Sequence, residues 1–485
     1  MRIAIVGGGY VGLVSGACFA SMGTEVVIVE ADATKFAALR DGRIPIYEPG
    51  LDRLVADCVD AGRLRFEDTL EAGLPGASVV FLAVGTPSRR GDGHADLTHV
   101  FAAAAQVAAA MTGPAVIVTK STVPVGTGRR VKQMMEELRP DLRIEVASNP
   151  EFLREGSAIE DFMRPDRVVI GADDETAREA LRTLYRPLNL IETPILFTGL
   201  ETAELIKYAS NSFLAMKITF INEMADLCEA LGADVHDLAR GLGLDRRIGG
   251  KFLHPGPGFG GSCFPKDTKA LMRIAQDAGT PSRLVETVVS VNEARKAGMA
   301  GRILAAFGGS VRGKRIAVLG LTFKPETDDM REAPSIGILH RLIEEGALIV
   351  AFDPVGIEQA RPLLPGAVDY APDAVSAVAG ADGLVLITEW NEFRALAPDW
   401  LSEAMSGKVV VDLRNVFDPH AMRRAGFAYH SIGRPAAAAR AMAEAATLED
   451  RPRSGMAGVS MGSLSSPSFA GAGARCSASV AERLW

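Results

Sequence analysis

The sequence is poor in cysteine and histidine, which limits the metal chemistry open to it. Its 485 residues include five cysteines and seven histidines. The cysteines are odd in number and far apart, no two histidines stand at i, i+4, and none lies beside a cysteine. This pattern argues against a structural zinc site. We therefore expect no metal, and at most one cysteine with a chemical role.

Long apolar runs and an excess of basic charge are missing too. No run approaches the roughly 20 apolar residues of a membrane helix, and the first residues show no signal-peptide pattern. With 52 basic and 60 acidic residues, the formal net charge is -8, which gives no footprint for nucleic acid. A local Lys and Arg cluster could still bind phosphate. We expect a cytoplasmic protein with neither a membrane nor a nucleic-acid partner.

Apolar runs alternate with helix-length segments along the first part of the chain. Strands are predicted at residues 2–6, 24–29, 79–84, 115–119 and 144–148, and helices at residues 10–22, 97–110 and 128–138. Strands that alternate with helices indicate a parallel sheet covered on both faces. The 48% hydrophobic content is sufficient for two or three such domains.

A second α/β pattern follows a helical middle. A helix with few breakers is predicted from about residue 200 to 231, and further helices surround a Gly/Pro-rich loop at 254–267. Strands are then predicted at residues 314–319, 347–352, 383–387 and 408–413, with a helix at residues 335–345. The fold class is thus α/β, with two Rossmann-like doubly wound parallel sheets joined by a long central helix.

The predicted domains have different expected roles. Their bounds are residues 1–195, 196–300 and 301–434, followed by a tail at residues 435–485. The third domain repeats the strand–helix pattern of the first domain but lacks its glycine fingerprint. We therefore expect it to bind something other than a whole dinucleotide. The tail is rich in Gly, Ser and Ala, a composition typical of disorder.

A dinucleotide fingerprint follows the first predicted strand. Gly7, Gly9 and Gly12 form G-x-G-x-x-G at the start of a helix, whose N-terminus would bind a pyrophosphate. An ordinary glycine-rich turn is the alternative, but Glu30 ends the second strand at the distance expected for a ribose ligand. A carboxylate there would repel a 2′-phosphate and favours NAD over NADP. Lys35 nearby softens that preference.

The loop at 254–267 contains one cysteine among glycines. Most single cysteines are buried structural residues, but missing side chains around Cys263 would let a substrate reach the sulfur, and Asp267 follows four residues on. On the long helix, Lys207 and Asn211 stand at i, i+4 and share a face. That pair is either a solvated face or, beside Cys263, a candidate oxyanion and proton-handling site.

These motifs are part of a larger set of segments that all resemble the same known family. They are IAIVGGGYVGL, IYEPGL, VGTP, KSTVPVGT, SNPEFLREGSAIEDFMRPDRVVIG, ETAELIKYASNSFLAMKITFINE, DRRIGGKFLHPGPGFGGSCFPKDT, GLTFKPETDDMRE and VVDLRNVFD. Together they resemble the UDP-glucose/GDP-mannose dehydrogenases over residues 1 to about 434. RIGGKFL and PGPGFGGSCFPKD resemble the UDP-glucose branch. GDP-mannose enzymes usually have Leu in place of Phe264, and UDP-N-acetylmannosamine enzymes usually have His in place of Ser262.

The resemblance implies NAD in the first domain, UDP in the last and a homodimer core at the long helix. It implies a four-electron oxidation of UDP-glucose at C6 through a Cys263 thiohemiacetal and thioester, releasing two NADH. The free thiol pKa is about 8.5, and a cation such as Lys207 is expected to lower it. Lys207 and Asn211 would hold the developing oxyanion.

The resemblance also implies three sets of site residues. Catalytic residues would be Cys263, Lys207, Asn211, Asp267, Glu155 and Thr122. Substrate-binding residues would be Glu151, Phe152, Leu153, Arg247 from across the dimer interface, Phe252, Leu253, Phe259, Gly260 and Lys324. NAD-binding residues would be Gly7, Gly9, Tyr10, Val11, Gly12, Glu30, Lys35, Thr86, Thr122, Glu155 and Arg331. The family often has a second Arg after Arg414, where this chain has Asn415, which leaves that contact open.

Two rival functions remain. A two-electron 3-hydroxyacid dehydrogenase shares the plan of a Rossmann domain followed by helices, but needs neither the cysteine nor a third α/β domain. A non-catalytic NAD-binding or scaffold protein would not need Cys263, Lys207 and Asp267 together. The number of NADH molecules formed per substrate separates the first rival from the four-electron reaction.

Overall fold

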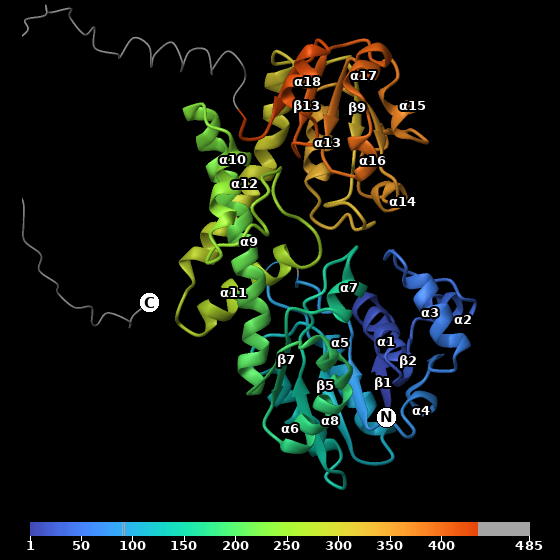
Figure 1. Ribbon diagram of the computed structural model, residues 1–485. Helices are drawn as coiled ribbons and strands as arrows, with labels where there is room; N and C mark the ends of the chain where they lie inside the picture. The colour runs from blue at the N-terminus through green and yellow to red at the C-terminus, as the bar shows by residue number, and fades with distance from the viewer. Residues whose placement is uncertain (90, 92, 435–485) are drawn as a thin grey trace, which may run out of the picture. The chain divides into compact units, whose positions relative to one another are not determined.

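The first sheet follows the order expected of a dinucleotide-binding fold. The computed structural model describes residues 1–89, 91 and 93–434, so the predicted tail lies outside the described residues (Figure 1). Eight strands are ordered β3-β2-β1-β4-β5-β6-β7-β8. Their bounds are β1 (Arg2–Val6), β2 (Glu25–Val29), β3 (Leu64–Glu67), β4 (Val79–Leu82), β5 (Ala115–Thr119), β6 (Ile144–Ser148), β7 (Val168–Ala172) and β8 (Ile195–Thr198). Neighbouring strands are parallel except β6 and β7, so β7 and β8 run opposite to the rest.

Helices cover both faces of this sheet, because successive side chains of a strand point to opposite faces. Ile3 and Ile5 of β1 join a core with α1, α3, α7 and α8, whereas Ala4 and Val6 join another with α5 and α6. The helices are α1 (Tyr10–Ser21), α2 (Ala33–Arg40), α3 (Leu51–Asp60), α4 (Leu70–Gly73), α5 (Thr98–Ala110), α6 (Thr127–Leu138), α7 (Ala158–Met163), α8 (Glu175–Leu184) and the 3-10 helix η1 (Arg186–Ile191).

The second sheet repeats the same order, β11-β10-β9-β12-β13-β14, and every neighbouring pair is parallel. Its strands are β9 (Arg315–Leu319), β10 (Leu348–Phe352), β11 (Asp369–Tyr370), β12 (Gly383–Leu386), β13 (Val409–Asp412) and β14 (Ala428–Ser431). Its helices are α13 (Pro334–Glu344), α14 (Ile357–Ala360), α15 (Ala374–Val378), α16 (Asn391–Arg394), α17 (Pro398–Ala404) and α18 (Pro419–Arg424). The predicted pair of Rossmann-like sheets is confirmed.

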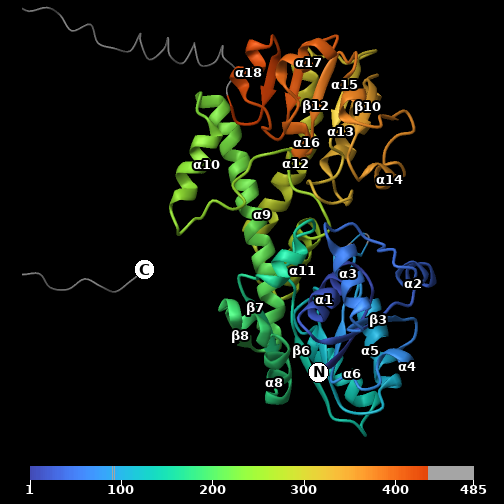
Figure 2. The same ribbon diagram turned by 45° about the vertical axis from the view of Figure 1, so that its right-hand side comes forward.

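Four helices lie between the sheets in sequence. They are α9 (Leu200–Leu231), α10 (Val235–Leu244), α11 (Phe264–Asp277) and α12 (Arg283–Ala306). Helix α9 has the predicted bounds, begins after Gly199 and ends at Gly232 in the left-handed conformation that glycine adopts readily. It packs along α11 and α12 (Figure 2) and touches β7. Among the described helices, none combines the length and apolarity needed to cross a bilayer.

Five strands were absent from the prediction, and most of them share a physical reason. β3, β8, β11 and β14 are the outermost strands of the two sheets. An outer strand is partly exposed and tolerates polar or charged side chains, which interrupt the apolar run in β3, β11 and β14, whereas β8 (ILFT) is apolar but only four residues long. The fifth, β7, lies next to an outer strand.

Candidate active site

Two of the three fingerprint glycines, Gly7 and Gly12, occupy positions where a side chain would collide. Gly7 has φ +109°, and an added Cβ would lie 2.7 Å from the Ala83 carbonyl oxygen. A Cβ on Gly12 would lie 1.9 Å from the Gly7 oxygen, whereas Gly9 faces open space. The turn therefore brings bare backbone to the N-terminus of α1, where N–H groups and the helix dipole favour an anion.

Glu30 closes this turn from the end of β2. Its Oε2 accepts a hydrogen bond from the Gly8 N–H at 2.9 Å, and its Oε1 accepts one from the Asp32 N–H at 2.8 Å. A buried carboxylate at the rim of the fingerprint fits a ribose hydroxyl better than a phosphate. Lys35 is exposed on α2.

A cleft of about 290 Å³ brings further predicted cofactor residues together. Tyr10 and Glu155 line it from the first sheet's side, and Arg331 lines it from the loop after β9. Of the other predicted contacts, Val11 lies in the first turn of α1, Thr86 is buried after β4, and Thr122 is half-buried after β5.

Glu155 connects the two halves of the chain at this cleft. Its Oε1 accepts from Ser262 Oγ at 3.0 Å and from Arg331 at 3.3 Å, and its Oε2 accepts from Thr327 Oγ1 at 3.1 Å. Burial and the nearby Asp329 raise the pKa of Glu155, against the opposing effects of Arg331, Ser262 and Thr327. A carboxyl group with a raised pKa suits proton transfer.

Cys263 is the N-cap residue of α11. Ser262 Oγ lies 3.5 Å from its sulfur. The N-terminus of α11 and the Lys207 ammonium favour the thiolate. Lys207 thus lowers the thiol pKa as expected, but burial outweighs it and raises the pKa of Cys263 overall. The resting group is the thiol, and a thiolate needs further stabilisation or a base.

Lys207 and Asn211 both point into this buried cluster from α9. Lys207 Nζ donates to Glu151 Oε1 at 3.2 Å, and Asn211 Nδ2 donates to Asp267 Oδ2 at 2.6 Å. Burial lowers the pKa of Lys207, but Glu151, Cys263 and Asp267 together outweigh it and raise the pKa. The ammonium therefore persists at neutral pH. The alternative of a solvated face is wrong, since both side chains are buried.

The glycines near Cys263 have a packing role that the sequence did not indicate. A Cβ on Gly260 would lie 2.4 Å from the Glu332 carbonyl oxygen, and one on Gly261 would lie 2.7 Å from the Phe323 ring. These glycines thus let the loop after β9 approach the cysteine loop. That loop holds Glu326 and Glu332 at positive φ, a conformation that is uncommon for non-glycine residues and is often found at functional sites.

Aromatic side chains line the region beside Cys263. Phe252, at φ +66°, and Phe259 each lie 6.0 Å, ring centre to ring centre, from Phe264. Leu253 is buried in the hydrophobic core that joins β9 and β10 to α9, α12 and α13. Phe152 and Leu153 follow Glu151, and Leu153 N donates to Glu151 Oε2 at 2.6 Å. Lys324 is half-buried within electrostatic reach of Cys263, and burial lowers its pKa.

The predicted contact Arg247 and the position of Asn415, where the resemblance left a contact open, lie away from this cluster. The Arg247 side chain is 89% exposed, and its guanidinium pairs with Asp245 at 2.6 Å. Asn415 adopts φ +56° and exchanges hydrogen bonds with the Ile432 backbone. Asn415 therefore stabilises the loop after β13 and, being neutral, adds no positive charge beside Arg414.

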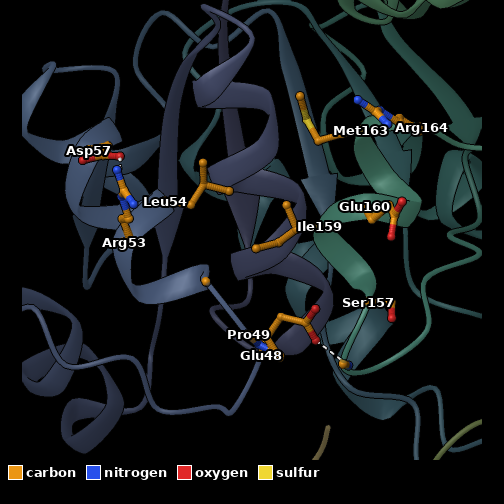
Figure 3. Close-up of a pocket in the computed structure, with 12 residues that line it drawn as sticks. Glu48, Pro49, Arg53, Leu54, Asp57, Ser157, Ile159, Glu160, Met163 and Arg164 are labelled. Carbon is orange, nitrogen blue, oxygen red and sulfur yellow. Dashed lines mark hydrogen bonds and ion pairs between the residues drawn. The ribbon is translucent and has the colours of Figure 1, made fainter.

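A separate cavity of about 590 Å³ lies between α3 and α7 (Figure 3). Leu54 and Ile159 face each other across it. Glu48 at its edge accepts hydrogen bonds from Gly156 N at 2.6 Å and Ala158 N at 2.7 Å. Glu48 thereby holds the turn that follows Glu155, a contact that sequence reasoning missed although it lies in the segment IYEPGL.

The central domain of a known family accounts for the helices that carry this cluster. The UDP-glucose/GDP-mannose dehydrogenase family matches the chain with its NAD binding domain at residues 1–189, its central domain at 201–294 and its UDP binding domain at 317–419. The chain belongs to this family. It is therefore an NAD-dependent dehydrogenase, and the first sheet is the NAD-binding one.

Relatives and solved structures agree with this family. The chain is 59% identical to a UDP-glucose 6-dehydrogenase of Rhizobium meliloti (strain 1021), over 90% of this chain and 100% of the relative. It is 45% identical to one of Bacillus subtilis (strain 168), over 90% and 94%. A UDP-glucose dehydrogenase from Pyrobaculum islandicum superposes with a TM-score of 0.81 at 40% identity, over 88% and 96% of the two chains.

Proposed function

We propose that the protein is a UDP-glucose 6-dehydrogenase that oxidises the C6 hydroxymethyl group of UDP-glucose to a carboxylate and reduces two NAD. The observation that carries the proposal is the cluster beside the cofactor cleft in which the half-buried Cys263 lies with the buried Lys207, Asn211 and Asp267. Relatives that match this chain over 94% or more of their own length and are named UDP-glucose 6-dehydrogenase support the choice of sugar nucleotide. The second sheet, without a glycine fingerprint, would bind the UDP moiety.

The residues divide the chemistry among them. NAD, when bound, accepts the hydride in both oxidations. The first oxidation gives a C6 aldehyde, and the Cys263 sulfur adds to it as a thiohemiacetal with its oxygen held by Lys207 and Asn211. Loss of the second hydride leaves a thioester, and water then releases the acid and restores the thiol. Asp267 and Glu155 would handle protons, and Thr122 would position the water.

Substrate contacts follow from the surroundings of the cysteine. Glu151, Phe152 and Leu153 would border the sugar, and the ring cluster of Phe252, Leu253 and Phe259 with Gly260 would border the nucleotide. Lys324, half-buried near Cys263, would meet the diphosphate, whose charge it complements. Arg331 and Tyr10 would contact the cofactor from opposite sides of the cleft.

We further propose a homodimer formed through α9, acting in the cytoplasm. Leu205, Phe213, Phe220, Leu227 and Leu231 are large apolar side chains that stay exposed on this helix. They are spaced by eight, seven, seven and four residues, which places them on one stripe of the helix, an unusual feature for a solvated helix. Arg247 of one subunit would then complete the neighbour's substrate site. Free cysteines fit a reducing compartment.

The proposal is tested by the number of NADH formed per sugar and by the loss of turnover when the Cys263 sulfur is replaced. Purified protein with limiting UDP-glucose and excess NAD should form two NADH per sugar; one NADH would instead support the hydroxyacid type. Cys263→Ser should reduce steady turnover by at least about 1000-fold, because a hydroxyl is a far weaker nucleophile and a poorer leaving group. Cys228→Ala, a buried cysteine distant from the cluster, is the control. Near wild-type turnover in Cys263→Ser would refute the thioester route.

A further inference from the structure

Lys120 is a buried lysine with no role in the proposed mechanism. It lies within electrostatic reach of Glu151 and Lys207. Lys120 follows the end of β5 and is only 4% exposed. Its Nζ donates to Asn149 Oδ1 at 3.0 Å and to Tyr185 Oη at 3.1 Å. The rings of Phe162 and Tyr185 each lie 5.8 Å from the ammonium. Its hydrogen-bond partners are thus all neutral.

Such a group is costly to bury without a reason. An ammonium taken out of water without a carboxylate partner at hydrogen-bond distance destabilises the fold, and a methionine could fill the same space. Burial lowers the pKa of Lys120 to about 7, with Glu151 favouring the charged form and Lys207 opposing it. The charge of this side chain therefore changes near neutral pH.

Lys120 is connected to Glu151 and Lys207 through the short turn at residues 149–151. Asn149, which binds Lys120, also donates to the Val169 carbonyl at 2.8 Å, so the turn from β6 is fixed on both sides. Two residues later Glu151 binds Lys207. The charged and titratable groups that face Lys120 are Glu151 from this turn, Lys207 from α9 and Tyr185 from the end of α8.

We propose that Lys120 is a positioning residue that holds the 149–151 turn and supplies a second positive charge behind the Glu151–Lys207 pair, favouring the Cys263 thiolate. Glu151 opposes the thiolate and Lys207 favours it, so a cation that offsets Glu151 increases the thiolate fraction. This role deepens the proposed function, on which its relevance to turnover rests. Lys120 itself touches neither the substrate nor the sulfur.

The test measures Cys263 alkylation by iodoacetamide in the full-length protein without nucleotide sugar, from pH 6 to 9, with the modified peptide quantified by mass spectrometry. Lys120→Met should react at least about threefold more slowly than wild type at pH 6, where Lys120 is charged, corresponding to a thiol pKa shift of about half a unit. The difference should vanish near pH 9, where the wild-type lysine is neutral. A merely structural role would loosen the site and give equal or faster alkylation at every pH.

Tyr185→Phe provides a second variant that keeps the lysine and the ring. It removes one acceptor from the ammonium, so the inflection near pH 7 in the alkylation profile should move to lower pH. A wild-type profile that follows a single titration, or a Lys120→Met profile parallel to it, would overturn the proposal. If UDP-glucose is not oxidised at all, the proposed function fails while these alkylation profiles still decide the role of Lys120.

Discussion

Individual side chains in this protein often serve two partners, and Glu30 is an example. It was predicted as a ribose ligand, and it also accepts hydrogen bonds from the N–H groups of Gly8 and Asp32. The same carboxylate thus holds the shape of the fingerprint turn and carries the charge that disfavours a 2′-phosphate. Replacing Glu30 should therefore change the binding of both NAD and NADP.

Glu30→Ala should narrow the ratio of kcat/KM for NAD over NADP by on the order of 10-fold, because the repulsion of the 2′-phosphate is lost. The KM for NAD should rise as well, since two backbone donors lose their acceptor. Steady-state kinetics with both cofactors measure this. Glu25→Ala, an exposed residue of the same strand, should leave the ratio unchanged. An unchanged ratio in Glu30→Ala would remove the residue from cofactor selection.

At the scale of elements, α9 contributes side chains to several parts of the site. Its first turns carry Lys207 and Asn211, and Glu204 on the same helix accepts hydrogen bonds from Gly126 N at 2.6 Å and Gly128 N at 2.7 Å. Those N–H groups belong to the start of α6, which lacks a side-chain cap of its own. One helix therefore positions Lys207 and caps the helix that follows the Thr122 loop.

Glu204→Ala should destabilise the protein by about 1–3 kcal/mol, because two buried backbone donors lose their acceptor. Burial raises the pKa of Glu204 to about 7, above the unfolded value of about 4.3. Its protonated form therefore stabilises the fold below about pH 4.3, and that contribution is lost as the pH rises through 7. Urea unfolding should show a larger effect at pH 5 than at pH 8.

The control for this prediction is Glu201→Ala, one turn earlier on α9. Glu201 forms an exposed ion pair with Arg129, which is worth at most about 1 kcal/mol. Equal losses in the two variants would mean that the cap contributes nothing beyond a surface charge.

At the scale of the whole molecule, the stripe of large apolar side chains on α9 stays exposed to solvent in a single chain. Phe213→Glu together with Phe220→Glu should convert a dimer into monomers, because burying two carboxylates in an apolar interface costs several kcal/mol. Sedimentation velocity measures the change. Leu138→Glu on α6, an equally exposed apolar site, should not alter assembly. A double variant that stays dimeric would place the interface elsewhere.

The proposed sharing of Arg247 gives a complementation test. Arg247→Ala and Cys263→Ala subunits should each be nearly inactive alone. Mixed and allowed to exchange, they should regain up to about a quarter of wild-type activity, since half of the dimers are hybrids with one intact site. Hybrid formation is checked with two different affinity tags. Hybrids without activity would show that each site uses its own Arg247.

Part of this protein could be predicted from its sequence because the signals are local. The fingerprint of Gly7, Gly9 and Gly12 and the bounds of α9 depend on backbone conformation and periodicity within short windows. The candidate cluster of Cys263, Lys207 and Asn211 was suggested by the glycine-rich loop and by the shared helix face of the last two residues, but helical spacing left a solvated face open, and the roles came from the family resemblance. Their burial and their separate partners, Glu151 and Asp267, were beyond the sequence.

Only the tertiary structure decided the remaining features, because each joins residues distant in sequence. Lys120 would pass for a surface lysine until β5, β6 and α8 bring Asn149 and Tyr185 to it. The outer strands pair only after the sheets assemble. Gly261, expected to give a substrate access, is required by the Phe323 ring of the second half. The thiol pKa likewise follows from burial, which sums contributions from every element around the sulfur and has no local sequence signature.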